Sequence, residues 1–205
     1  MPDGVIEPKK GRKFDQVLEG ARKVFMTDGY EGASVDDIAK AAGVSKATLY
    51  SYFPDKRMLF LQVAKTECGR QADEAVETID MTAPVEKVLC DVAIQIVDFM
   101  TSDFGQRIFR ICVGESDRFP ELGREFYESG PQLVRNRIVA YFHKAVDRGE
   151  LKIEDFDLAA EQFQELCKAH LFPRMVFNMA DKFSREEKMR VVNGAVEMFM
   201  ARYGA

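Results

Sequence analysis

The chain has 205 residues, of which 46% are hydrophobic and only 21 are Gly or Pro, a composition typical of a folded globular protein rather than a disordered one. No uncharged apolar run approaches the roughly 20 residues that a bilayer crossing needs, and residues 1–10 lack the apolar stretch of a signal peptide. We therefore expect a cytoplasmic protein without membrane association.

The net charge of −5 at pH 7 is unevenly distributed. Residues 1–57 hold ten Lys and Arg against nine Asp and Glu, whereas the remainder holds 19 against 25. The acidic residues 58–205 do not exclude nucleic acid as a partner. They repel a polyanion and thereby confine its binding to the less acidic N-terminal segment.

Residues 1–10 are predicted to form a flexible arm that ends in a basic cluster at Lys9, Lys10, Arg12 and Lys13. Such an arm either gathers phosphate contacts or is a solvated tail, and both interpretations stay open. Apolar residues then recur at helical spacing from Phe14 to Phe25, with Gly29 as the expected stop.

Two short helices joined by a tight turn are predicted over residues 34–53. Ser34 is the expected N-cap of the first helix, and Gly43 ends it in the left-handed conformation. Ser45 caps the second helix, and Pro54 stops it because proline disfavours helical geometry at the preceding residue. The expected inner face of the second helix is formed by Leu49, Tyr52 and Phe53.

The outward face of this second helix carries short or hydrogen-bonding side chains, and no acidic residue occurs from Ser45 through Pro54. This pattern favours a recognition helix that enters the major groove of DNA, with a plain surface helix pair as the alternative. Lys46 is the candidate for donating to a guanine edge, and Thr48 for contacting a thymine methyl group or a phosphate.

Residues 37–56, DIAKAAGVSKATLYSYFPDK, with Leu59 and Phe60 following, resemble the DNA-binding signature of the TetR/AcrR family of bacterial transcription regulators. The resemblance implies an all-α homodimer with an N-terminal DNA reader and a C-terminal domain that dimerises and binds a small effector. Tyr52 is equally a candidate for the core, because its spacing points inward. The residues that the resemblance implies at the DNA backbone are Ser34, Ser45, Tyr50, Tyr52 and Lys56.

Asp55 is expected to cap a long helix that ends near Ile79 and links two domains, 1–57 and 58–205. Pro173 is expected to kink or break the helix in which it lies. The further helices are predicted over 85–100, 104–115, 118–131, 133–146, 158–179 and 184–203.

A second resemblance runs through residues 115–122, Phe126, Tyr127 and residues 148–151, which are similar to the C-terminal domain of the AefR-like subgroup. Aromatic and sulfur-bearing residues on the central helices are candidates for an effector pocket, although core packing explains most of them equally well. They indicate a bulky effector that is largely apolar or aromatic. The candidates are Phe99, Met100, Phe104, Ile108, Phe109, Cys112, Glu115, Phe126, Tyr127, Tyr141, Phe142, His170 and Met175.

The last two predicted helices are rich in soft apolar residues. A second copy of the chain would cover them in a four-helix bundle, and burial within one protomer is the alternative. We favour the homodimer, because a palindromic double-stranded operator has two half-sites whose centres are about 34–36 Å apart. A helix-turn-helix protein needs two DNA-binding domains to contact both of them.

Enzymatic chemistry has little support in this sequence. There is no glycine-rich phosphate loop, no His-x-x-x-His pair and no Gly-x-Ser-x-Gly. Four widely separated cysteines and two histidines indicate buried, reduced thiols, with neither disulfides nor a metal site, and no cofactor is expected. The resulting prediction is a ligand-responsive repressor; the alternatives are an activator of the same fold and a ligand-sequestering or adaptor protein without DNA binding.

Overall fold

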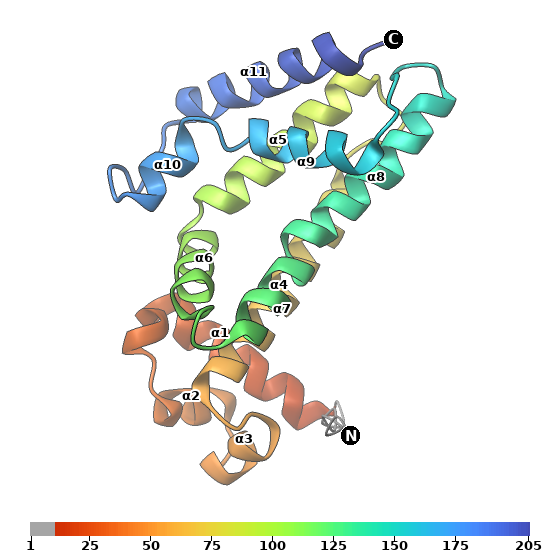
Figure 1. The fold of residues 1–205 in the computed structure, drawn as a ribbon. Helices are drawn as coiled ribbons and strands as arrows, with labels where there is room; N and C mark the ends of the chain where they lie inside the picture. The colour runs from red at the N-terminus through yellow and green to blue at the C-terminus, as the bar shows by residue number, and fades with distance from the viewer. Residues whose placement is uncertain (1–10) are drawn as a thin grey trace. The chain divides into compact units, whose positions relative to one another are not determined.

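A computed structural model describes residues 11–205, except for the side chains at positions 71, 72, 75 and 76. Within this range the regular structure consists of eleven helices and one isolated β-bridge, between Leu151 and Gly204 (Figure 1). The predicted all-α class is confirmed. The predicted arm with Lys9 and Lys10 lies outside the described residues.

The chain divides into two compact units, one up to Glu67 and one from Cys68 onward. The division falls inside helix α4 (Lys56–Thr78), so this helix belongs to both units. The boundary expected from the sequence, after residue 57, lies at the start of the same helix. Among the described residues, no helix is both long and apolar enough to cross a membrane.

The first unit contains α1 (Arg12–Gly32), α2 (Val35–Ala42), α3 (Lys46–Tyr52) and the start of α4. Gly29 interrupts the helical geometry of α1 with a φ of 73°, as expected for the predicted stop, and a last turn follows it. The side chains that α1 buries recur at helical spacing and are Phe14, Val17, Ala21, Val24 and Phe25.

A glycine allows α1 and α2 to approach each other closely. Gly20 is buried, and a Cβ atom built on it would lie 2.6 Å from the main-chain nitrogen of Ala42 and 2.7 Å from its Cα. Real Cβ atoms do not come this close to a neighbouring main chain, so only glycine fits at this position.

The second unit is built from the end of α4 and the helices that follow it. Figure 1 shows α11 running beside α5, and α8 lies against both α7 and α9. A continuous hydrophobic cluster between α5, α8, α9 and α11 forms its core. The helices are α5 (Val85–Thr101), α6 (Asp103–Glu115), α7 (Pro120–Ser129), α8 (Pro131–Asp147), α9 (Phe156–Leu166), α10 (Leu171–Val176) and α11 (Arg185–Tyr203).

The prediction of one helix over residues 158–179 was wrong in its extent, although a break was expected. α9 ends at Leu166, and α10 begins at Leu171 after His170, whose φ is 65°. The break precedes Pro173 because a proline ring clashes with the carbonyl four residues earlier, which here belongs to Ala169. The chain therefore leaves helical geometry before the proline and resumes it in time for Pro173 to occupy the first turn of α10.

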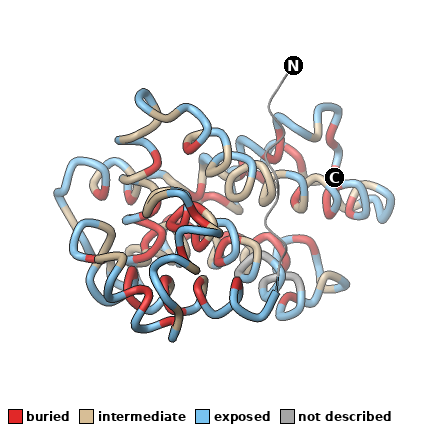
Figure 2. The backbone as a smooth tube through the Cα atoms, turned by 90° about the horizontal axis from the view of Figure 1, so that it is seen from below, coloured by how far each residue is buried: buried red, intermediate tan, exposed pale blue. Residues whose placement is uncertain are grey.

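Much of the apolar surface of α9 and α11 is buried within the protomer, as the alternative to the dimer prediction assumed. Buried and exposed positions alternate along the helices in Figure 2. Phe163 and Phe199 are in ring contact at 5.2 Å inside the core. Leu158 on α9 and Met198 on α11 remain 47% and 62% exposed, so a smaller apolar surface is left for a partner.

Candidate functional site

Two serine side chains cap the helices of the α2–turn–α3 motif. Ser34 Oγ accepts a hydrogen bond from the Asp37 amide at 3.0 Å, and Ser45 Oγ accepts one from the Thr48 amide at 3.1 Å. Each serine thereby satisfies an amide that has no partner inside its own helix. Both caps stand where the sequence predicted them.

The turn between the two helices depends on one glycine. Gly43 adopts φ 64° and ψ 35°, and its amide donates to the carbonyls of Ala39 and Lys40. The Val44 amide then donates to the Ala39 carbonyl at 3.1 Å. This left-handed ending closes α2 and fixes the direction in which α3 begins.

Helix α3 has one fully buried side chain, half-buried ones at Thr48 and Tyr52, and an exposed face. Leu49 is fully buried, whereas Lys46, Ala47 and Ser51 are exposed and Tyr50 is 49% exposed. The outward face has no acidic side chain of its own, as predicted. A helix with this face, capped at its start and anchored by one apolar residue, suits insertion into a DNA groove.

Lys46 forms an ion pair with Asp36, which lies in the first turn of α2. Both side chains are more than half exposed, so solvent weakens this pair. Sequence reasoning did not identify Asp36 as a partner, because residues ten apart meet here only through the turn at Gly43. Any base contact by Lys46 requires that it exchange this carboxylate for DNA.

Tyr52 is half-buried on the side of α3 that faces α1. Its ring meets the Phe14 ring edge-on, with centroids 5.6 Å apart, while Phe53 lies 5.4 Å from the same ring. The two roles predicted for Tyr52 are compatible, because its ring packs on α1 while part of the residue remains accessible.

Lys56, a predicted DNA contact, is engaged with the protein itself. Its Nζ donates to the main-chain carbonyls of Tyr30 at 2.8 Å and Ala33 at 3.1 Å, and it lies 4.5 Å from the centre of the Tyr30 ring. The neighbouring Asp55 caps α4 by accepting from the amide of Met58 at 3.0 Å. Lys56 thus ties the start of α4 to the segment that leads into α2.

Some of the predicted effector residues gather between α6, α7 and α10. The Phe109 ring lies 6.4 Å from Phe126 and 5.1 Å from Phe172, and all three residues are half-buried. Phe99 and Phe104 form a separate pair at 6.4 Å. Ile108, Cys112 and Met175 are buried.

The polar residues predicted for the effector pocket do not meet. Tyr141 belongs to the core cluster, where burial raises its pKa although Arg148 donates to its hydroxyl at 3.3 Å. Tyr127 and His170 are exposed, and His170 Nε2 lies 3.1 Å from the Arg174 guanidinium. In the described part of the chain, therefore, these three side chains share no buried site.

Three of the four cysteines, Cys68, Cys112 and Cys167, are buried, and Cys90 is half-buried. Burial raises the pKa of Cys112 and of Cys167 to about 12. These two residues are therefore neutral thiols near neutral pH, whereas nucleophilic chemistry requires the thiolate.

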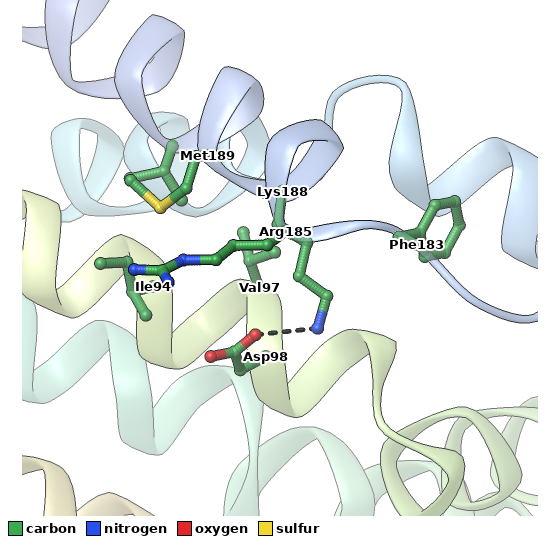
Figure 3. Close-up of a pocket in the computed structure, with 8 residues that line it drawn as sticks. Ile94, Val97, Asp98, Phe183, Arg185, Lys188 and Met189 are labelled. Carbon is green, nitrogen blue, oxygen red and sulfur yellow. Dashed lines mark hydrogen bonds and ion pairs between the residues drawn. The ribbon is translucent and has the colours of Figure 1, made fainter.

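A pocket of about 350 Å³ lies between α5 and the start of α11 (Figure 3). The Lys188 ammonium donates to the Asp98 carboxylate at 2.9 Å and joins the two helices beside it. None of the predicted effector residues lines this pocket. No motif marks it, because its walls are brought together only by the packing of two distant helices. The lining residues are Ile94, Val97, Asp98, Phe183, Arg185, Lys188, Met189 and Val192.

Comparison with known protein families identifies both parts of the chain. Residues 17–63 match the family of bacterial regulatory proteins named tetR, and residues 87–205 match the C-terminal domain of AefR-like transcriptional repressors. The second match alone covers more than half of the 205 residues.

Individual relatives agree with this assignment. A TetR-family regulator from Mesorhizobium loti MAFF303099 is 28% identical, with 97% of this chain and 100% of that chain covered and a TM-score of 0.81. The flavonoid-responsive regulator FrrA is 32% identical over 95% of this chain and 98% of that chain, with a TM-score of 0.72. The transcriptional repressor AcnR of Corynebacterium efficiens is 40% identical over 62 residues, which are 30% of this chain and 33% of AcnR.

Proposed function

We infer the function of this chain from the family to which it belongs: it is a member of the TetR family of bacterial regulatory proteins, with an AefR-like C-terminal domain. It is a DNA-binding transcriptional regulator and not an enzyme. Beyond this, we propose a homodimeric repressor that occupies a palindromic operator and leaves it when a small, largely apolar effector binds. AcnR, which is 40% identical to this chain over 62 residues, is named a repressor.

The outward face of α3 is the observation on which the proposal rests. A seven-residue helix with one buried side chain contributes little to the core, so its exposed face is available for recognition. Lys46 at its start is suited to donate to a guanine edge, and Thr48 to contact a thymine methyl group or a phosphate.

The remaining contacts in this proposal go to the DNA backbone. They position the protein on the duplex without reading its sequence. The Lys56 ammonium has three N–H donors, and two of them are used in hydrogen bonds to main-chain carbonyls of the protein. We therefore propose that Lys56 donates its third N–H to a phosphate while it anchors the segment before α2. The proposed backbone-contacting residues are Ser34, Ser45, Tyr50, Tyr52 and Lys56.

For the effector, we propose a planar aromatic molecule. FrrA is named flavonoid-responsive and is 32% identical over nearly the whole of both chains. The Phe109 and Phe126 rings, which are half-buried and adjacent, offer faces and edges for stacking on such a molecule. The effector releases DNA only if it binds the DNA-free conformation more tightly than the DNA-bound one. Tyr141 belongs to the core, Tyr127 and His170 are exposed, and Phe99 and Phe104 form a separate pair, so these five predicted residues are not part of the proposed region. The residues proposed for it are Ile108, Phe109, Cys112, Phe126 and Met175.

The homodimer is proposed to form through α9 and α11, with the loop after α10 beside them. Leu158 and Met198 expose apolar surface on the two helices, and Phe177 and Met179 after α10 are 76% and 73% exposed. A symmetric copy would cover these side chains and present two recognition helices to one duplex.

Selection from a random duplex library tests the DNA-binding part of the proposal. We expect the selected duplexes to share a consensus with two inverted half-sites. Fluorescence anisotropy at physiological salt should give an affinity for this consensus roughly 10³-fold or more above that for random duplex. Enrichment of a single half-site would contradict the symmetric dimer, and absence of any consensus would contradict operator recognition.

The effector part is tested separately on the operator complex. Titration with apigenin, a planar flavonoid, is expected to release the operator from the wild type and to act more weakly on Phe109→Ala. Val113→Ala, which truncates an exposed residue on the same helix, is the matched control and should respond like the wild type. Equal responses of the two variants would exclude Phe109 from the effector site.

A further inference from the structure

The pocket between α5 and α11 has an apolar floor built from both helices. Ile94 and Val97 stand one turn apart on α5, and Met189 and Val192 stand one turn apart on α11. Val97 and Val192 are buried, whereas Ile94 and Met189 are half-buried. A volume of about 350 Å³ lies at the small end of the range of ligand sites, which is about 300–1,000 Å³.

The rim of the pocket carries one cation that the protein does not neutralise. Lys188 is paired with Asp98 at 2.9 Å. Arg185, in contrast, is exposed and has neither an ion pair nor a side-chain hydrogen bond within residues 11–205. Figure 3 shows its side chain extending across the pocket toward Ile94. Arg185 is also the first residue of the 19-residue α11, where the helix dipole favours negative charge.

The wall beside Phe183 is held in place by its own network. The Arg174 guanidinium lies 5.4 Å from the centre of the Phe183 ring and forms an ion pair with Glu187 at 2.8 Å. Glu187 also accepts from the Ser184 amide at 2.9 Å, which completes a capping box at the start of α11. The pocket is therefore largely preformed, which lowers the ordering cost of binding.

From this arrangement we propose that the α5–α11 pocket binds a small amphipathic monocarboxylate, of the size of octanoate. The carboxylate accepts hydrogen bonds from the Arg185 guanidinium, whose planar fork matches its two oxygens. The hydrocarbon part lies against Ile94, Met189 and the buried valines. One available cation over an apolar floor does not suit a polyphosphate, which needs several cationic donors.

This site is distinct from the aromatic residues of α6, α7 and α10 proposed for the effector, and it does not rest on them. Calorimetric titration of the full chain with sodium octanoate, without DNA or flavonoid, is the test. We expect one saturable site per chain and weaker binding of 1-octanol, which keeps the hydrocarbon but lacks the charge. Failure here leaves the operator proposal untouched, because the two experiments share no ligand.

Variants assign the binding to this pocket. Arg185→Gln is expected to weaken octanoate binding by about ten-fold, since a charge-assisted hydrogen bond is lost. Arg190→Gln removes another exposed cation of α11 that does not line the pocket, and it should bind like the wild type. Ile94→Glu places a carboxylate on the apolar floor and should abolish octanoate binding, with an unchanged circular dichroism spectrum as the folding control. Equal octanoate affinity of the wild type and Arg185→Gln, or the absence of saturable binding, would overturn the proposal.

Discussion

The ammonium of Lys56 donates to the main-chain carbonyl of Tyr30 at 2.8 Å and lies 4.5 Å from the centre of the ring of the same residue. A further hydrogen bond to the Ala33 carbonyl, at 3.1 Å, extends this contact to the residue before the Ser34 cap. One side chain at the start of α4 thereby holds the segment that sets the entry of α2. The signature lysine has a structural role in the free protein, in addition to any contact with DNA.

Lys56→Met should therefore destabilise the protein as well as weaken DNA binding. Loss of hydrogen bonds to a charged group predicts a decrease of about 1.5–3 kcal/mol in the free energy of unfolding, measured by urea denaturation. Lys40→Met, which changes an exposed lysine in the last turn of α2, is the control. It removes only a favourable interaction with the helix dipole, so the free energy of unfolding should fall by less than about 1 kcal/mol. Unchanged stability with lost operator binding would show that Lys56 acts on DNA alone.

Gly20→Ala should destabilise the protein even though alanine is the better helix former. The added methyl group would lie 2.6–2.7 Å from the Ala42 main chain, so α1 and α2 must separate. Overpacking of this kind costs about 1–3 kcal/mol, more than the gain of about 1 kcal/mol from helix propensity.

Gly114→Ala on α6 is the matched control for this substitution. Nothing lies within 4 Å of its added methyl group, so the propensity gain alone applies and the variant should be slightly more stable than the wild type. Thermal denaturation distinguishes the two, because the predicted shifts have opposite signs. A stabilised Gly20→Ala protein would refute the close approach of the two helices.

Lys46→Ala and Tyr50→Phe should affect DNA binding in different ways. If Lys46 donates to a base edge, its removal costs affinity and also relaxes the preference at one base pair, by about 1–3 kcal/mol. Tyr50→Phe removes the hydroxyl that we propose to contact a phosphate, and it should weaken binding to all operator variants similarly. Ranking a set of single-base operator variants by anisotropy checks this; an unchanged ranking for Lys46→Ala would exclude base readout.

The α2–turn–α3 motif was predictable because its determinants are local. Ser34, Gly43 and Ser45 act on amides and carbonyls within a few residues, so their residue types and spacing suffice. The same holds for the break at Pro173, which depends on a proline and the residues just before it.

Features that depend on tertiary contacts escaped prediction. Gln106 donates to the carbonyl of Asp181, 75 residues away, and Lys188 to Asp98, 90 residues away. Aromatic periodicity placed Tyr141 among the effector candidates, but that periodicity is the same for core and pocket residues. Only the packing of α5 against α11 brings Arg185 to an apolar floor, so no sequence pattern marked that pocket.

Glu187 should make the stability of the second unit sensitive to acid. The Arg174 guanidinium and the Ser184 amide lower the pKa of this carboxyl from 4.5 to about 2. Because the folded protein holds the group ionised more strongly than the unfolded chain does, the stabilisation is fully present above about pH 4.5 and is lost as the pH falls toward about 2. The difference in melting temperature between the wild type and Glu187→Gln should therefore shrink across this window. Glu186→Gln, in the same first turn of α11, should follow the pH dependence of the wild type. A difference between the wild type and Glu187→Gln that stays constant with pH would show that Glu187 stabilises the start of α11 only as a neutral hydrogen-bond acceptor.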